Sequence, residues 1–237
     1  MTCDDDRLAG PRREPGAPAG HGRHAGGPEA EGVVKFRGEH DLVDLPVSLA
    51  PVAATLAAWR RVLMALRLVG CDPERYGGYG FGNLSARLPP FDAPPAGRPF
   101  LVTGSQTGHL PHLALADCAR VERCDPAANH LRSRGRATPS SESMTHAALY
   151  ALSPEIRAVF HVHSPDLWRR RELPRTSQTV PYGTPGMAAE VGRVWRDDLR
   201  AARRGLIVMG GHEDGALAFA ETPAAAGDLL VSALASR

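Results

Sequence analysis

The chain has 237 residues, of which 43 % are hydrophobic and 23 % charged, and its formal net charge is +2. This length and composition suit one sizeable packed domain and exclude a wholly disordered chain. The small net charge and the aromatic content of 5 % argue against nucleic acid as a main partner, since single-strand binders combine basic grooves with aromatic platforms.

We expect neither a membrane partner nor a secreted protein. No apolar run approaches the roughly 18 residues that a membrane helix needs, and the N-terminal segment lacks the apolar core of a secretory signal. The four cysteines form no CxxC pair and are scattered at positions 3, 71, 118 and 124. They are interpreted as reduced thiols of a cytoplasmic protein.

The first part of the chain is predicted to be a disordered tail followed by a helix. Residues 1–31 contain almost no large apolar side chains and cannot bury enough surface to order, so the domain is expected over residues 32–237. Gly70 is the expected stop of the first helix. That helix is predicted from an apolar face with alternating steps of four and three residues, formed by Val52, Leu56, Trp59, Leu63 and Leu66.

Strands and helices then follow without regular alternation. A Gly-rich loop at 77–82 precedes an expected strand at 84–88 and, after a Pro-rich turn, a strand at 100–102; the stretches around 121 and 131 predict a hairpin. A second helix is expected to begin at Ser140 or Ser141, with Glu142 in its first turn. Further elements are expected at 158–163, 206–209 and 216–219 as strands, and near 186–201 and 223–235 as helices. This order argues against a Rossmann domain or a barrel of βα repeats.

The strongest chemical signal is the tripeptide His161-Val162-His163. Residues i and i+2 of a strand point to the same face with Cα atoms roughly 6.5 Å apart, and two imidazoles so placed can bind one ion. The apolar neighbours of these histidines predict an interior strand. From the tripeptide alone, a pair of hydrogen-bonded core histidines remains an equal alternative.

Weaker signals surround this strand. His212 follows two glycines after the expected strand at 206–209, where the chain can turn sharply; a lone loop histidine is more often only solvated. Glu142 could be a fourth ligand or a base, or a simple helix-end charge. His146, one turn later, is expected to pack against or orient Glu142. Three polar Gly-rich turns, at 81–85, 102–108 and 140–141, could bind a phosphate through backbone N–H groups, although ordinary turns are the default interpretation.

In this order the segments resemble the class II aldolase/adducin family. The resemblance runs from about residue 48 to the end and includes the fuculose-phosphate aldolases. The matching pieces are Gly82-Asn83-Leu84-Ser85, Thr103-Gly104, Ser140-Ser141-Glu142, His161-x-His163, Pro181-Tyr182-Gly183-Thr184 and His212.

The resemblance implies a fold, an assembly and a site. The fold is a three-layer α/β/α sandwich around a mainly antiparallel sheet, and the assembly is a homotetramer with sites between subunits. His161, His163 and His212 would hold Zn²⁺, or Mn²⁺, Fe²⁺ or Co²⁺, with Glu142 as a ligand of the substrate-free site and as the general acid/base. Tyr182 matches a tyrosine that donates a proton in a neighbouring subunit's site. A substrate phosphate would be bound by Gly82, Asn83, Thr103, Gly104, Ser140 and Ser141.

The resemblance implies an aldolase that cleaves a small, phosphorylated hydroxy-carbonyl or sugar substrate through a metal-stabilised enediolate. A dehydratase or epimerase acting on a sugar phosphate, an iron-dependent oxygenase and a non-catalytic adducin-like domain are the alternatives, because one scaffold supports several reactions. Two departures from the family leave the substrate open: the stretch 104–111, where His109 could enter the site, and Gly211-His212-Glu213-Asp214-Gly215 in place of the usual His-Gly.

Overall fold

Within residues 36–236, which the computed structural model describes, an eight-stranded sheet runs in the order β1-β7-β6-β5-β4-β8-β10-β9. Its neighbouring strands are antiparallel except for the pair β1 and β7. The predicted tail, residues 1–31, lies outside the described residues. The strands are β1 (Arg37–Asp41), β2 (Gly70–Cys71), β3 (Gly80–Phe81), β4 (Asn83–Arg87), β5 (Phe100–Thr103), β6 (Cys118–Asp125), β7 (His130–Arg134), β8 (Ala158–His163), β9 (Gly205–Val208) and β10 (Gly215–Ala220).

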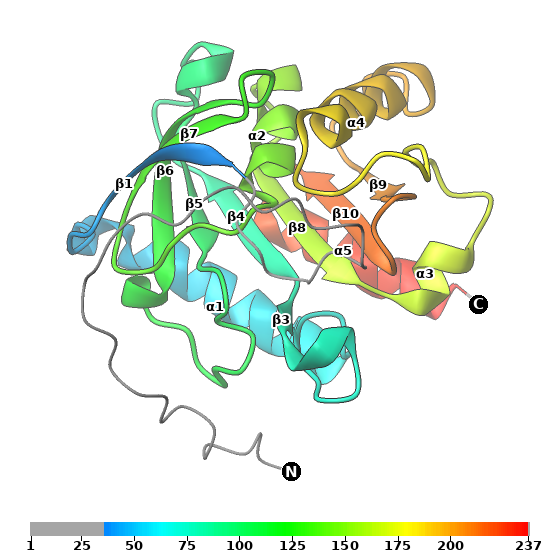
Figure 1. Cartoon of the computed structure of the whole chain (residues 1–237), viewed down its shortest axis with the longest axis horizontal. Helices are drawn as coiled ribbons and strands as arrows, with labels where there is room; N and C mark the ends of the chain where they lie inside the picture. The colour runs from blue at the N-terminus through cyan, green and yellow to red at the C-terminus, as the bar shows by residue number, and fades with distance from the viewer. Residues whose placement is uncertain (1–35, 237) are drawn as a thin grey trace, which may run out of the picture.

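Helices cover both faces of this sheet (Figure 1). They are α1 (Ala50–Ala65), α2 (Ser143–Leu152), α3 (Pro165–Arg169), α4 (Pro185–Asp197) and α5 (Pro223–Ala235). Leu56 of α1 and Leu230 of α5 belong to one buried apolar cluster, whereas Met144 of α2 and Val191 of α4 belong to another on the opposite face. The predicted three-layer sandwich with a mainly antiparallel sheet is confirmed.

Strand β8 lies in the middle of the sheet, and its alternation decides where its histidines point. All six of its residues are buried, which confirms the predicted interior strand. Phe160 and Val162 pack into the cluster of α1 and α5, and Val159 packs into that of α2 and α4. Since side chains two residues apart share a face, His161 and His163 face the layer of α2 and α4.

Several element boundaries differ from the prediction. Helix α2 begins at Ser143, with Glu142 as its N-cap residue, because residues 140–143 first form a turn in which the Ser143 N–H bonds to the Ser140 carbonyl. Helix α1 ends at Ala65, and Gly70 instead pairs with Phe81 in the small β2-β3 sheet. Strand β1 was not predicted, because its sequence RGEHD is wholly polar apart from glycine; as an edge strand it needs no apolar alternation.

The helical stretch Val47–Ala65 is long and apolar enough to cross a membrane, judged by length and composition alone. The sequence reasoning had not singled it out. The same test is passed by mostly buried core helices of soluble proteins. In this stretch 22 % of the apolar window is buried, and its buried residues include Leu56 and Leu63, which pack against the sheet. Within the described part of the chain, Cys118 and Cys124 are buried free thiols.

Candidate metal centre

Three histidines from distant parts of the chain converge at the ends of β8 and β9. His161, His163 and His212 each offer a ring nitrogen, and these nitrogens lie within 4.8 Å of one another. The ring centroids are 4.7–4.9 Å apart, and each residue is at most 4 % exposed. The three imidazoles that the sequence placed in one site therefore meet.

Strand pairing positions the first two ligands. His161 lies opposite Asn83 of β4, and His163 lies opposite Gly215 of β10, so both are fixed by neighbouring strands on either side. The chain continues from β9 through a tight turn in which the His212 N–H donates to the Met209 carbonyl.

The glycines before His212 are required by close packing. A Cβ atom at Gly211 would lie 2.0 Å from the carbonyl oxygen of Val180, and one at Gly210 would lie 2.3 Å from that of Thr176. The turn that carries His212 therefore presses against the segment 176–180 with no room for a side chain, which fixes the position of the third imidazole.

The electrostatics of the cluster favour neutral imidazoles. Burial lowers the pKa of His161 and of His163 well below the usual value, and the neighbouring histidines lower both further. A neutral ring keeps a lone pair for a metal ion. The amide nitrogen of Asn83 lies 3.3 Å from His161 Nδ1, whereas His161 Nε2 has no hydrogen bond within the described residues. Buried polar atoms rarely stay unpaired, so three buried imidazoles with this geometry suit Zn²⁺ or a similar ion.

Glu142 is buried at the start of α2, and Thr145 donates a 2.8 Å hydrogen bond to its Oε2 atom. The residues that come within ligand distance of one another are the three histidines and do not include Glu142. Its carboxylate instead lines a neighbouring pocket.

The pocket beside the histidines gathers most of the predicted phosphate-binding residues. Gly82, Asn83, Gly104, Ser140 and Ser141 line it together with Glu142, and the Asn83 amide donates to Ser140 Oγ at 3.1 Å.

Thr103 is not among these lining residues; its hydroxyl accepts the Leu84 N–H inside the sheet. The loop after β5 supplies residues that sequence reasoning had treated only as part of a polar turn. They are Ser105, Gln106, Thr107 and Gly108, and Gly80 joins them.

Tyr182 lies in its own chain's site. Its ring stacks on His212 with centroids 4.2 Å apart and planes 18° apart, and the residue is 7 % exposed. The expectation that Tyr182 serves a neighbouring subunit stays a prediction.

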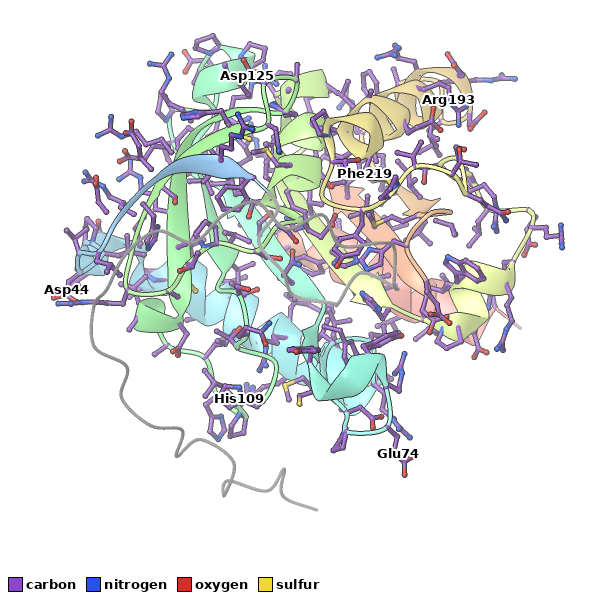
Figure 2. All side chains as sticks on the ribbon, in the orientation of Figure 1. Asp44, Glu74, His109, Asp125, Arg193 and Phe219 are labelled. Atoms are coloured by element: carbon purple, nitrogen blue, oxygen red, sulfur yellow. The ribbon has the colours of Figure 1, made fainter. Side chains whose placement is uncertain are left out.

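Two other histidines have different surroundings from those expected. His146 does not orient Glu142, because its Nδ1 atom lies 2.7 Å from Ser85 Oγ, which also bonds to the Tyr150 hydroxyl. Burial lowers the pKa of His146 to about 3. His109 is exposed on its loop, away from the body of the protein (Figure 2), and does not line the pocket.

The fold and the histidine cluster define an α/β/α protein with a candidate site for a divalent ion. The sequence model of the family described as Class II Aldolase and Adducin N-terminal domain matches residues 72–233. This is well over half of the chain, and the protein belongs to the class II aldolase/adducin family.

Solved structures share the fold at low identity. An L-fuculose 1-phosphate aldolase is 19 % identical with a TM-score of 0.57, covering 78 % of this chain and 82 % of its own. YgbL from Escherichia coli, described as a candidate aldolase/epimerase/decarboxylase, is 19 % identical with a TM-score of 0.52, covering 77 % and 84 %. An L-fuculose 1-phosphate aldolase from Glaciozyma antarctica PI12 is 16 % identical with a TM-score of 0.52, covering 78 % and 69 %. No curated protein matches the chain.

Proposed function

We propose that the protein is a metal-dependent lyase of the aldolase type that cleaves a small, phosphorylated hydroxy-carbonyl compound. The observation that carries the proposal is the meeting of three buried imidazoles beside a pocket that is lined by the buried residue Glu142. Membership of the class II aldolase/adducin family supports an enzyme of this kind.

The residues that would hold the ion are His161, His163 and His212, with Zn²⁺ as the first candidate and Mn²⁺, Fe²⁺ or Co²⁺ as others. Their ring nitrogens lie within 4.8 Å of one another, and neutral imidazole is a usual ligand of these ions. A bound ion would supply Lewis-acid stabilisation of the negative charge that develops when the C–C bond breaks.

The pocket would bind and orient the substrate. Its lining includes the Ser140 and Ser141 hydroxyls, the Asn83 amide and the Gly-rich loops at 82 and 104–108, which together suit an anionic group such as a phosphate. Glu142 would move a proton to or from the reacting carbon, because it is the carboxylate that lines this pocket. Tyr182, whose ring stacks on His212, would serve the departing aldehyde.

Elemental analysis of the purified protein, followed by assay of a panel of ketose phosphates with the ion found, tests the proposal. Mass spectrometry of the products is decisive, because cleavage gives two fragments, whereas dehydration gives one product lighter by water and epimerisation gives an isomer. A protein that holds none of Zn²⁺, Mn²⁺, Fe²⁺ or Co²⁺ would refute the metal-dependent function and favour an adducin-like interaction role.

We also propose a cytoplasmic homotetramer, on the strength of the family resemblance alone. Light scattering of the purified chain measures the assembly, and a monomer at micromolar concentration contradicts it.

A further inference from the structure

Three residues interlock beside the candidate metal centre without being part of it. The Tyr76 hydroxyl donates a 2.7 Å hydrogen bond to Asp214 Oδ2 and accepts one of 2.6 Å from Arg75. The Arg75 guanidinium lies 3.7 Å from the same carboxylate oxygen. We call this group the Arg75-Tyr76-Asp214 clasp.

The clasp contacts the ring of one candidate ligand, His163, and is bonded to the turn that carries another, His212. Asp214 follows His212 by two residues within one tight turn, and its carbonyl accepts the N–H of Ser164, the residue that follows His163. The Tyr76 ring meets the His163 ring edge-on, with centroids 4.6 Å apart. One side chain, Tyr76, therefore touches the strand ligand and is bonded to the turn that carries the loop ligand.

The backbone at both ends of the clasp is unusual. Tyr76 has φ of 51° and Asp214 has φ of 60°, in the left-handed region that side-chain-bearing residues seldom adopt. Such conformations persist where the surroundings over-determine them, and they concentrate at functional sites. The side chains that bond to each other thus lie on two turns that are both held away from their relaxed conformation.

Arg75 and Tyr76 make further contacts that pack a group of side chains against His163. The Arg75 guanidinium lies 4.8 Å from the centroids of both the Tyr76 and the Phe81 rings, and these two rings meet edge-on at 5.0 Å. Phe81 in turn lies 5.5 Å from the His163 ring. The rings of Tyr76 and Phe81 therefore pack against His163, and the ion pair between Arg75 and Asp214 links them to the turn that carries His212.

We propose that the Arg75-Tyr76-Asp214 clasp is a positioning device that sets the mutual placement of His163 and His212 and thereby the affinity of the site for its ion. The inference rests on the metal centre of the proposed function. Groups that orient metal ligands from outside alter affinity by about 10–100-fold when they are removed. Asp214, which lies in the stretch 211–215 that departs from the usual His-Gly, acquires a role in this way, because it anchors the turn.

The test compares metal affinity in variants that remove the clasp with variants of their neighbours. Tyr76→Phe keeps the ring and removes the hydroxyl, and Asp214→Asn keeps a residue that tolerates left-handed backbone but removes the charge. Tyr79→Phe and Glu213→Gln are the matched controls, because both residues are exposed and lie in the same two segments. The Zn²⁺ dissociation constant is measured by competition with a chromophoric chelator, and the visible spectrum of the Co²⁺-loaded protein reports ligand geometry.

The clasp predicts a loss of affinity of about 10–100-fold in Tyr76→Phe, a smaller loss in Asp214→Asn, an altered Co²⁺ spectrum in both, and no change in either control. The double variant should lose no more than the larger single loss, since both changes break one unit. An unchanged Zn²⁺ affinity and Co²⁺ spectrum in Tyr76→Phe would overturn the proposal. Losses of affinity that add up in the double variant would overturn it too.

Two further measurements distinguish a failure of the clasp proposal from a failure of the proposed function and from a loss of stability alone. If the unaltered protein binds no ion, the proposed function fails at once, before any variant is compared. If Tyr76→Phe lowers only the melting temperature of the metal-free protein, while its folded form binds Zn²⁺ as tightly as the unaltered chain does, the clasp is merely structural and the proposal is overturned.

Discussion

Tyr182 stacks on His212, with nearly parallel rings whose centroids are 4.2 Å apart. The contact places a phenol directly against one of the three candidate ligands, so the same residue can hold the imidazole in place and present a hydroxyl near the candidate metal centre. The two roles depend on different parts of the side chain and can be separated by substitution.

Replacement of Tyr182 by Phe should keep metal binding and lose activity. Phenylalanine preserves the stacked ring, whereas the proton donor is removed, and a missing general acid costs about 10²–10⁴-fold in rate. Tyr182→Leu should in addition weaken Zn²⁺ binding, because the stack is lost. Metal content and turnover of the two variants are compared; full activity of Tyr182→Phe would leave the residue with a packing role alone.

His161→Ala and His212→Ala should each abolish metal retention. A structural or catalytic zinc site needs at least three protein ligands, and each substitution leaves two. Elemental analysis after gel filtration measures the loss, with His109→Ala as the control, since that histidine is exposed outside the pocket. If the first two variants held as much ion as the unaltered protein, the assignment of the metal site to these histidines would be refuted.

Glu142→Gln should cost activity far more than metal. The three imidazoles remain, while the group that moves the proton is lost, so a rate decrease of about 10²–10⁴-fold is expected. Glu155→Gln, in an exposed ion pair with Arg203, is the matched control. A variant that loses its ion but keeps its turnover with added metal would reverse the assignment of roles.

The metal-free protein should lose stability as the pH falls below 6.5. Burial lowers the pKa of His146 to about 3 and holds those of His161 and His163 well below the usual value, so in this range the unfolded chain binds protons that the folded chain does not. Stability therefore rises with pH, by about 1.4 kcal/mol per unit for each such histidine.

Urea unfolding of chelator-treated protein at pH 7.5 and 5.5 measures this dependence. The stability of His146→Gln should depend less steeply on pH, because one of the three buried histidines is removed. Equal stabilities at the two pH values would mean that the buried histidines are not neutral in the folded state.

Gly82→Ala should destabilise the fold by about 1–3 kcal/mol. The residue has φ of +75°, and a Cβ atom would lie 2.5 Å from Val69 Cγ1. Thermal unfolding compares it with Gly97→Ala, where the nearest atom within 4 Å is the Pro94 side chain at 3.8 Å. Similar melting temperatures for the two variants would show that the turn before Asn83 can relax.

Much of the fold could be predicted because its strands bury apolar residues at regular steps. The strand 158–163 and the helix 223–235 were found with their observed bounds. Strand β1 was not predicted, because an edge strand can consist of polar residues and then shows no apolar alternation. The start of α2 was placed two or three residues too early, because Ser140 and Ser141 are good caps locally but the turn they form leads to Glu142.

Part of the candidate site could likewise be predicted from the sequence, and part could not. His161 and His163 could be paired from their spacing on one strand, whereas His212 was placed with them only through the family resemblance. The Arg75-Tyr76-Asp214 clasp could not be foreseen, because Tyr76 and Asp214 are 138 residues apart and neither lies in a recognisable motif. Spacing can predict contacts within one element, but contacts between turns depend on the whole topology.

The pairing of His161 with Asn83 and of His163 with Gly215 has a consequence for the order of events during folding. The three ligands and the pocket come from segments between residues 80 and 212, and they meet only after β4, β8 and β10 have joined. A chain in which only β8 had formed would offer at most two adjacent imidazoles. A metal ion that binds the folded chain alone would stabilise it by an amount that rises with the logarithm of the free-ion concentration, once that concentration exceeds the dissociation constant.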